Sequence, residues 1–286
     1  MSGQEPIKVG LIGSSIQDSS SPSLHEAEGA AQGLDYSYRL FDLDTERGGV
    51  GALPAVLARL AGEGYAGCNV TFPVKQAVLP MLDRLSPEAE AMGAVNVVRF
   101  APDGAREGHN ADWWGFGENL RRTLRGSPLG AVALLGAGGA GAAAAYALGR
   151  LGATRLIVLD NDGERATEVV RRAKRDGLPA EVRPIADVPD VLHRVDGLVQ
   201  ATPVGMAKHP GMPLDPEALR PELWLAEIIY VPVETELLRR ARAIGCRTIH
   251  GVGMVVLQAA RSFELFTGQT ADVARMFASF RSLVQV

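Results

Sequence analysis

Residues 67–75 bring three chemically useful side chains close together in the chain. They form a short apolar run that Pro73 interrupts, which predicts a buried strand followed by a helix that begins near Lys75. Asn69, Thr71 and Lys75 supply an amide, a hydroxyl and an ammonium there. Ligands of α/β proteins bind outside the carboxyl ends of strands, so these residues predict proton transfer on a polar small molecule. A capped turn with a solvated lysine explains the same segment equally well.

A glycine-rich loop at residues 136–141 matches the dinucleotide-binding pattern G-x-G-x-x-G in full. It follows an apolar run that predicts a strand and opens an alanine-rich run that predicts a helix, which is the context this pattern needs. Gly136 permits a tight turn, Gly138 lets backbone N–H groups approach a pyrophosphate, and Gly141 lets helix and strand pack closely. The helix N-terminus attracts the phosphates. A plain glycine-rich turn is the alternative.

Asp160 ends the next predicted strand, a little over twenty residues after the glycine loop begins. A carboxylate at this place accepts hydrogen bonds from the adenosine ribose and repels a 2′-phosphate, so it predicts NAD rather than NADP as the cofactor. Asp162 adds to the repulsion, and Arg165 is a nearby cation that can stack on adenine. A simple helix N-cap is the alternative role for Asp160.

Other polar residues lie near predicted element ends. Ser19 and Ser21 precede a helix that starts with Pro22, and Ser21 is the predicted N-cap; together they form a good carboxylate receptor or a plain capping cluster. Asp112 opens a helix between two predicted domains, as an N-cap or as the partner of Lys75. Asn96 is placed at a strand end, and Gln258 on a late helix. The histidines are scattered without metal-site spacing, so no metal is expected.

The order of elements predicts two α/β domains, because strands alternate with helices and then the pattern restarts. The first domain has strands at 7–12, 36–41, 68–70 and 94–100, and helices at 22–31, 50–60 and 75–82. The second has strands at 131–135, 155–159, 195–200 and 223–229, and helices at 139–151 and 164–174. Residues 125–128 form a natural break before the second domain. The final helices, from Gly253 onward, follow no further strand and are expected to pack on the first domain.

Composition narrows the functional classes. The chain has 286 residues, of which 47% are hydrophobic and 22% charged, as in globular proteins. Its net charge of −4 gives no reason to expect a nucleic-acid partner. It has no apolar run of the roughly 20 residues that a membrane span needs, and its first residues do not resemble a secretion signal. Cys68 and Cys246 are interpreted as reduced thiols, so a cytoplasmic location is expected.

Taken together, these residues resemble the shikimate dehydrogenase family along nearly the whole chain, most of all its actinobacterial NAD-linked quinate/shikimate branch. The motifs that carry the resemblance are Ser19-x-Ser21-Pro22-x-x-His25, Gly67-x-Asn69-Val70-Thr71-x-Pro73-x-Lys75, Gly93-Ala94-Val95-Asn96, Asn110-x-Asp112, the loop at 136–141, Ala201-Thr202-Pro203-x-Gly205-Met206, Tyr230-x-Pro232-x-x-Thr235-x-Leu237-Leu238 and Gly251-x-x-Met254-x-x-x-Gln258-Ala259-Ala260. Their number and order make coincidence implausible.

The resemblance implies an α/β fold of two domains. Residues 1–111, completed by 254–286, would form a substrate-binding, catalytic domain with a mixed, mainly parallel sheet. Residues 112–253 would form a Rossmann-type NAD domain. The implied enzyme is an NAD-dependent oxidoreductase that interconverts quinate and 3-dehydroquinate, or shikimate and 3-dehydroshikimate. That places it in quinate metabolism or in the shikimate pathway of aromatic amino acid biosynthesis. Its partner would be a small hydroxy-acid substrate, with a homodimer as one possible assembly.

The resemblance also implies roles for individual residues. Lys75 and Asp112 would form the catalytic acid–base pair. The implied substrate-binding residues are Ser19 and Ser21 for the carboxylate, and Asn69, Thr71, Asn96, Tyr230 and Gln258 for the rest of the molecule. The implied cofactor-binding residues are Gly136, Ala137, Gly138, Gly139, Ala140, Asp160, Arg165, Thr202, Gly251 and Met254, with Tyr230 also near the nicotinamide.

Two departures from the family pattern bear on the substrate. Ala111 stands where the family usually has threonine, and Trp113 and Trp114 follow Asp112 where smaller or polar residues are usual. If one tryptophan lines the pocket, the substrate is shifted, for example to an aminoshikimate-type compound; core packing is the alternative. Glu227 replaces a common aspartate, a minor change. A catalytically idle dinucleotide-binding regulator is a further alternative, against which Lys75 and Asp112 argue.

Overall fold

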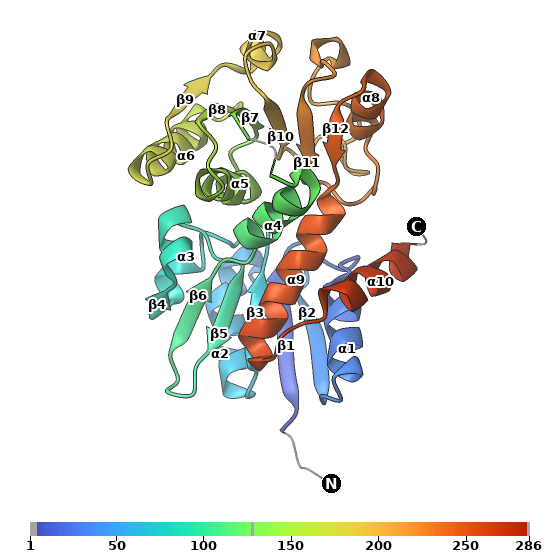
Figure 1. Ribbon diagram of the computed structural model, residues 1–286. Helices are drawn as coiled ribbons and strands as arrows, with labels where there is room; N and C mark the ends of the chain where they lie inside the picture. The colour runs from blue at the N-terminus through green and yellow to red at the C-terminus, as the bar shows by residue number, and fades with distance from the viewer. Residues whose placement is uncertain (1–4, 127–128, 285–286) are drawn as a thin grey trace. The chain divides into compact units, whose positions relative to one another are not determined.

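The computed structural model describes residues 5–126 and 129–284, which group into two units (Figure 1). Of these residues, those up to Ala111 and from Val256 onward form unit 1, and those within Asp112–Val255 form unit 2. Ser127 and Pro128 of the predicted break lie outside the described residues, as do residues 1–4. Helix α9 (Gly251–Thr267) contributes residues to both units.

Unit 1 contains a six-stranded mixed sheet in the order β2-β1-β3-β5-β6-β4. The strands are β1 (Ile7–Gly13), β2 (Tyr36–Asp42), β3 (Gly67–Val70), β4 (Arg84–Leu85), β5 (Val97–Phe100) and β6 (Arg106–His109). Strand β1 pairs in parallel with β2 and β3, whereas β5 runs antiparallel to both β3 and β6. The carboxyl ends of β1, β2 and β3 therefore lie at the same edge of the sheet.

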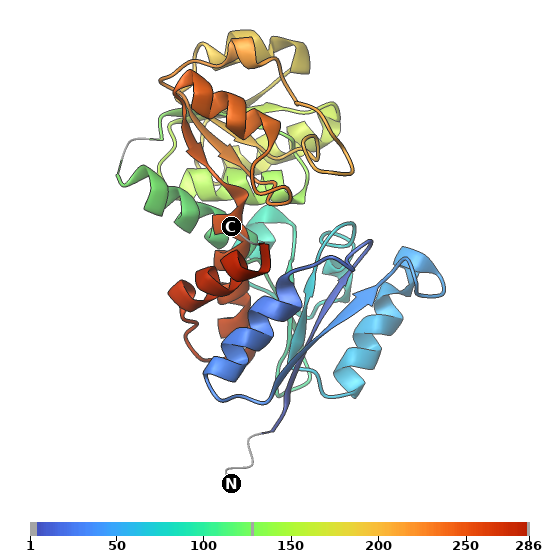
Figure 2. The ribbon, with the colours of Figure 1, turned by 90° about the vertical axis from the view of Figure 1, so that its right-hand side faces the viewer.

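Helices cover both faces of this sheet. Figure 2 shows α1 (Ser21–Ala31) and α10 (Val273–Val284) on one side and α2 (Leu53–Gly62) on the other. Side chains of β3 alternate between these faces, as the pleat of a strand requires. Cys68 and Val70 join the core that contains α2, whereas a Cβ on Gly67 would meet Phe266 of α9 at 2.6 Å. Asn69 points the same way as Gly67 and reaches Ser262 of α9.

Unit 2 contains a six-stranded sheet, parallel throughout, in the order β12-β11-β10-β7-β8-β9. The strands are β7 (Ala131–Leu135), β8 (Arg155–Leu159), β9 (Ala180–Arg183), β10 (Gly197–Gln200), β11 (Trp224–Glu227) and β12 (Arg247–Ile249). The chain winds outward from β7 in one direction and then returns to β10 and winds in the other. This is the doubly wound Rossmann topology, with its switch point between β7 and β10.

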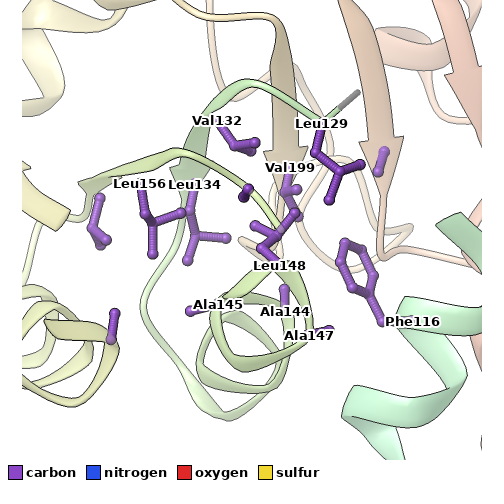
Figure 3. Packing of buried hydrophobic residues seen from close by; sticks show 14 of the residues in the cluster. Phe116, Leu129, Val132, Leu134, Ala144, Ala145, Ala147, Leu148, Leu156 and Val199 are labelled. Carbon is purple, nitrogen blue, oxygen red and sulfur yellow. The ribbon is translucent and has the colours of Figure 1, made fainter. Parts of the chain in front are cut away.

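The helices of unit 2 bury the apolar strands on both faces. They are α4 (Asp112–Leu124), α5 (Gly139–Arg150), α6 (Gly163–Arg175), α7 (Val188–Leu192) and α8 (Glu236–Ile244). Figure 3 shows one of the two cores, in which Leu134, Leu156 and Val199 of the sheet pack with Leu148 of α5 and Phe116 of α4. Alternate residues of the same strands, such as Leu135 and Leu159, enter the core on the opposite face. These strands are continuous apolar runs because both faces of the sheet are buried.

Several local predictions were wrong. Residues 75–82 form turns and the short 3-10 helix η2 (Leu79–Met81) rather than a helix, because Pro80 lacks an N–H and disfavours helical geometry in the residue before it. Ser21 is the first residue of α1, and Ser20 occupies the N-cap without a side-chain cap bond. Asn96 precedes β5 instead of ending a strand. Short elements went unpredicted: β4, β6, β9, β12, α3 (Pro87–Met92), α7 and α8.

Candidate active site

The segment that follows β3 is fixed to the end of β1 by backbone hydrogen bonds. Thr71 N donates to Ile12 O at 2.9 Å, and Ser14 N donates to Phe72 O at 3.0 Å. A cis peptide bond joins Phe72 to Pro73 and turns the chain. The loop after β1, which leads to the two serines, and the loop after β3, which leads to Lys75, are therefore joined edge to edge.

Lys75 is held by the backbone even though the predicted helix is absent. Its carbonyl accepts a hydrogen bond from Val95 N at 2.9 Å. Val74 and Val78 on either side are fully buried in the core with α2, and Val78 N donates to Val74 O at 3.0 Å. Lys75 lies between these anchors with a half-buried side chain. The sequence thus places one lysine on a short, pinned turn at the carboxyl edge of the sheet.

Asn69 is committed to hydrogen bonds within unit 1. Its Oδ1 accepts from Tyr38 Oη at 2.9 Å, and its Nδ2 donates to Asn96 O at 3.1 Å and to Ser262 Oγ at 3.0 Å. Both amide protons are used, which leaves one lone pair of Oδ1 for any further partner. Asn69 therefore joins β2, β3, α9 and the residue before β5. Its predicted contact with a substrate hydroxyl would have to use that remaining lone pair.

Ser19, just before α1, and Ser21, its first residue, belong to the same network. Ser21 N donates to Ser19 Oγ at 3.3 Å, and the Ser21 side chain hydrogen-bonds Tyr38. Because the Tyr38 proton goes to Asn69, Ser21 Oγ is the donor toward the Tyr38 oxygen. Burial raises the pKa of Tyr38, and the Ser21 hydrogen bond opposes this rise in part. The first turn of α1 consequently presents oriented hydroxyls and a helix N-terminus, the combination that attracts anions.

The residues around Asp112 are buried. Asn96 Oδ1 accepts from Ala111 N at 2.7 Å, and Asn110 Nδ2 donates to Ala94 O at 3.0 Å. The side chain of Asn96 thus fixes the chain just before α4, whose first residue is Asp112, 5% exposed. A carboxylate in the first turn of a helix is favoured by the helix dipole. Lys75 belongs to unit 1 and Asp112 opens unit 2, so their pairing stays a prediction.

The departures from the family pattern have local explanations. Ala111 is fully buried, so a hydroxyl missing there leaves no gap in an exposed wall. Trp113 packs against the core of unit 2, with its ring edge-on to Tyr146 of α5 at 5.2 Å between centroids. Core packing is therefore confirmed for Trp113. Trp114 is half-buried on the adjoining position of α4.

The glycine loop of unit 2 has the geometry that its motif predicts. Gly136 has φ +102°, and a Cβ there would lie 2.7 Å from the Ala201 carbonyl carbon; a Cβ on Gly141 would lie 2.1 Å from Gly136 O. Nothing lies within 4 Å of the corresponding position on Gly138, which is the N-cap of α5 and has no side chain to cap the helix. Gly139 and Ala140 supply the first N–H groups of α5, so the loop fits a pyrophosphate.

Asp160 follows β8 and holds the glycine loop directly. Its Oδ2 accepts from Ala137 N at 2.5 Å and its Oδ1 from Asp162 N at 2.8 Å. The N-cap of α6 is Asp162, whose Oδ1 accepts from Arg165 N at 3.1 Å, and the Arg165 guanidinium forms an ion pair with Asp162 at 2.9 Å. The capping role considered for Asp160 thus belongs to its neighbour. Two lone pairs of the Asp160 carboxylate remain for ligand hydroxyls.

The remaining predicted cofactor residues lie after β10 and at the start of α9. The buried Gln200, which sequence reasoning missed, accepts from Thr202 N at 2.8 Å and donates to Val204 O at 2.9 Å, so it shapes the loop that carries Thr202. A Cβ on Gly251 would lie 2.4 Å from the carbonyl oxygens of residues 228 and 229. Met254 is buried in the core that Figure 3 shows in part.

Two further buried carboxylates fix loops. Sequence reasoning missed Asp42 and noted Glu227 only as a minor departure from the family pattern. Asp42 ends β2, and Glu227 ends β11. Burial raises the pKa of Glu227 to about 7, against hydrogen bonds from Ile229 N, the Thr235 hydroxyl and Ile228 N. Glu227 fixes the loop that carries Tyr230, a half-buried phenol whose pKa is also raised by burial. Asp42 fixes the loop before α1 in the same manner.

The structure adds one observation each on histidines, metals and membranes. Burial lowers the pKa of His25 to about 3, and its Nδ1 lies 3.0 Å from Tyr36 Oη, so it is a neutral core residue of α1. Within residues 5–126 and 129–284, no three metal-ligating side chains of histidine, cysteine, aspartate or glutamate gather into a group. None of the helices in these residues is both long and apolar enough to span a bilayer.

Comparison with known proteins decides the family. The family model of the shikimate dehydrogenase substrate binding domain matches residues 11–98, and that of the shikimate 5′-dehydrogenase C-terminal domain matches residues 251–276. The shikimate dehydrogenase (NADP(+)) of Streptomyces avermitilis is 48% identical over 283 residues, which cover 98% of this chain and 97% of that protein. The chain belongs to the shikimate dehydrogenase family. The predicted family, and with it the predicted oxidoreductase, is confirmed.

Members of the shikimate dehydrogenase family with both cofactor types resemble this chain. The quinate/shikimate dehydrogenase (NAD(+)) of Corynebacterium efficiens is 42% identical over 286 residues, with 98% of this chain and 99% of that protein covered. The solved quinate dehydrogenase from Corynebacterium glutamicum in complex with NAD has a TM-score of 0.93 at 40% identity, covering 98% of this chain and 100% of that one. The predicted two-domain α/β fold with a Rossmann-type domain is thereby confirmed.

Proposed function

We propose that this protein is an NAD-dependent dehydrogenase that interconverts quinate and 3-dehydroquinate, or shikimate and 3-dehydroshikimate. Unit 1 binds the substrate and unit 2 binds NAD. The observation that carries the proposal is Lys75 on its pinned turn, beside the serine loop at the carboxyl edge of the unit 1 sheet. The open glycine loop of unit 2 supports the dinucleotide half of the proposal.

In the proposed reaction a secondary alcohol becomes a ketone. The reacting O–H proton passes to the acid–base pair of Lys75 and Asp112, and the hydride of the same carbon leaves with its electron pair. NAD, when bound, accepts that hydride. Ser19 and Ser21 hold the substrate carboxylate at the N-terminus of α1, while Thr71, Asn96, Tyr230 and Gln258 hold hydroxyl groups. We assign Asn69 mainly to orienting these segments, since three of its hydrogen bonds are internal.

We propose NAD as the preferred cofactor, although relatives of both preferences resemble the chain. The Asp160 carboxylate is fixed against Ala137 of the glycine loop, where its charge repels a 2′-phosphate. Arg165, a cation in the first turn of α6, is paired with Asp162. The residues Gly136, Ala137, Gly138, Gly139 and Ala140 would face the pyrophosphate, and Thr202, Gly251 and Met254 would border the nicotinamide.

Replacing Lys75 tests the catalytic assignment. Lys75→Ala should lower kcat by about 10²–10⁴-fold, the usual contribution of a general acid–base group, and leave the Kd of NAD nearly unchanged because Lys75 lies in unit 1. Lys8→Ala is the matched control, since Lys8 is a lysine of unit 1 that lies on β1 and donates to Glu63 O. Turnover by Lys75→Ala close to wild type would sink the assignment, and a parallel loss of NAD binding would contradict the roles given to the two units.

A substrate panel tests the function itself. Initial rates with quinate, shikimate and an amino analogue, each with NAD and NADP at neutral and alkaline pH, should show turnover of at least one of the first two with NAD. Negligible rates on both would reject the proposal, and a rate confined to the amino analogue would favour the shifted substrate instead.

Asp160 gives a separate test of cofactor choice. Asp160→Asn keeps an acceptor for Ala137 N and removes the charge, so NADP should gain on NAD in kcat/KM by about tenfold or more. Asp162→Asn removes a charge two residues away while keeping a good N-cap, and should change the ratio much less. Equal use of both cofactors by the wild type would mean that Asp160 has been misinterpreted.

A homodimer remains a prediction, as does the cytoplasmic location. Light scattering on purified protein, with and without NAD, measures the molar mass directly. A mass of one chain under both conditions would reject the dimer.

A further inference from the structure

The loop between β1 and α1 is organised by one carboxylate. Asp42, 6% exposed at the end of β2, accepts hydrogen bonds from Ser15 N at 3.1 Å and Ile16 N at 3.3 Å. It also accepts from Gln17 Nε2 at 3.1 Å and from Asp44 N at 3.1 Å. The donors are divided evenly, because Ser15 and Asp44 bind Oδ1 whereas Ile16 and Gln17 bind Oδ2. The last residue of one strand thus fixes three consecutive residues of a neighbouring loop.

The bonds continue from Asp42 to the serines without a break. Ile16, whose N–H is held by Asp42, accepts from Ser19 N through its own carbonyl at 3.0 Å. Ser19 Oγ then accepts from Ser21 N at 3.3 Å. Moving the carboxylate would therefore move Ile16, and with it both hydroxyls at the start of α1.

The loop is held in a conformation that needs such support. Ser15 has φ +55°, a left-handed geometry that is unfavourable for a non-glycine residue and persists only where the surroundings impose it. Ser14 N on one side donates to Phe72 O at 3.0 Å, and Leu43 N donates to Gly13 O at 2.8 Å. Between these fixed points, Asp42 sets the path of the chain.

Asp42 is suited to this work as an anion. Burial favours its neutral form, but the hydrogen bonds from Asp44 N, Gln17, Ile16 N and Ser15 N outweigh burial and lower the pKa of Asp42. Hydrogen bonds to an ionised acceptor are about twice as strong as neutral ones. The Asp42 carboxylate accepts hydrogen bonds from four donors, three of which belong to the loop between β1 and α1, so its charge stabilises that loop.

We propose that Asp42 is a positioning residue for the substrate carboxylate: it fixes residues 15–17 and so sets the places of Ser19 and Ser21. The proposal rests on the proposed function, in which these two serines bind that carboxylate. Asp42 itself touches no substrate atom. Asp42 affects how tightly the substrate carboxylate binds. It does not affect the rate of the chemical step at Lys75.

The test is Asp42→Asn in the full chain. An asparagine has one acceptor oxygen and one NH₂ group, which is a donor. In either orientation of the amide, two of the four donors that Asp42 binds would face this NH₂ group in place of an acceptor oxygen. We expect KM for the carboxylate substrate to rise about tenfold, the equivalent of one modest interaction. We expect kcat at saturation to stay within about twofold and the Kd of NAD to stay unchanged, because both depend on groups that Asp42 does not hold.

Two comparisons give the test its specificity. Asp44→Asn is the matched control. Asp44 is exposed, and of the residues that Asp42 holds in the loop its carboxylate contacts only Ser15, whose hydroxyl donates to it at 2.8 Å. The KM of the Asp44→Asn variant should differ from that of the wild type by less than about twofold. A substrate amide, in which a carboxamide replaces the carboxylate, should show nearly the same kcat/KM in wild type and Asp42→Asn.

The outcomes separate the inference from the function. If the wild type is active and Asp42→Asn leaves KM unchanged, or lowers activity on acid and amide equally, the positioning role is wrong and the function stands. If the wild type turns over neither quinate nor shikimate, both fail together. If Asp42→Asn does not fold, Gln17→Ala removes one donor and should raise KM about two- to threefold; an unchanged KM in that variant overturns the inference.

Discussion

Asp42 in unit 1 and Glu227 in unit 2 occupy equivalent places. Each is the last residue of a strand, each is nearly inaccessible to solvent, and each ties down the loop that would contact a ligand. Their acidities nevertheless move in opposite directions. The pKa of Asp42 is lowered, whereas that of Glu227 is raised to about 7.

The number and strength of donors accounts for this contrast. Burial favours the neutral acid in both cases, but Asp42 receives four well-placed N–H donors. Glu227 receives Ile229 N at 3.1 Å, the Thr235 hydroxyl at 3.0 Å and a contribution from Ile228 N, and burial prevails. A buried carboxyl stays ionised only where enough donors replace the water it has lost. The two loops are therefore held by different species: an ionised carboxylate in unit 1, and in unit 2 a carboxyl that keeps its proton until the pH approaches 7.

The largest expected effect is the loss of the Asp42 acceptor. Asp42→Ala leaves four donors to find water, so the free energy of unfolding of unit 1 should fall by about 2–4 kcal/mol. All three tryptophans lie in unit 2, so far-UV circular dichroism in urea is the measurement for unit 1. Asp44→Ala is the control. An unfolding curve that overlays the wild type would show that the donors do not depend on Asp42.

The second effect concerns pH and has a defined sign. The folded pKa of Glu227 is about 7 against an ordinary value of 4.5, so between these values the folded state keeps a proton that the unfolded chain releases. Its contribution to stability is complete below pH 4.5 and is lost as pH rises through 7. Glu227→Gln should remove a decline of order 1–3 kcal/mol across this window.

Tryptophan fluorescence in urea at pH 5 and pH 8 measures that difference in unit 2. Asp42→Asn should leave the change in stability between pH 5 and pH 8 as it is in the wild type. A carboxyl whose pKa is lowered by folding stabilises the folded state at pH values above its ordinary pKa, and this stabilisation is lost only in stronger acid. If the free energy of unfolding changes equally with pH in the wild type and in Glu227→Gln, the pKa of Glu227 is not raised and the contrast with Asp42 is wrong.

The smallest effect sharpens the comparison at Thr235. This residue donates to Glu227 Oε2 and caps α8 by accepting from Leu238 N at 3.2 Å. Thr235→Val should cost about 1–2 kcal/mol in unit 2 and raise the pKa of Glu227 further, since one lowering donor is gone. Thr235→Ser keeps the hydroxyl and should stay within about 0.5 kcal/mol of wild type. A fully stable valine variant would show that Glu227 does not need this donor.

Much of the fold was predictable where the signal is local. Strands β7 and β8 are continuous apolar runs, and the glycine loop between β7 and α5 depends on backbone geometry that glycine alone permits. The predicted helix at 75–82 is wrong because Pro80 disfavours a helix despite the apolar spacing. Short strands such as β4 and β12 carry too few residues for any period to be seen.

The sequence indicated which residue types belong to the candidate site, but it indicated less well which hydrogen-bond partners each residue has. Lys75 and Asp160 were predicted as site residues because they follow strands. The internal role of Asn69 was hidden, since its partner Ser262 is 193 positions away in the chain. Asp42 was missed, and the role of Glu227 was not predicted, for the same reason. Their donors are set by the pairing of strands and loops, and a single acidic letter at a strand end does not reveal how many N–H groups will meet it.

Helix α9 has a consequence for how the protein is made. Its first residues belong to unit 2 and the rest, with α10, completes unit 1. On the ribosome, unit 2 is a continuous segment that can fold as soon as it emerges. The face of the first sheet that carries Gly67 and Asn69 must wait for Phe266 and Ser262. At about 5–20 residues per second, that wait is on the order of ten to forty seconds, so the half of the chain that is made first is finished last.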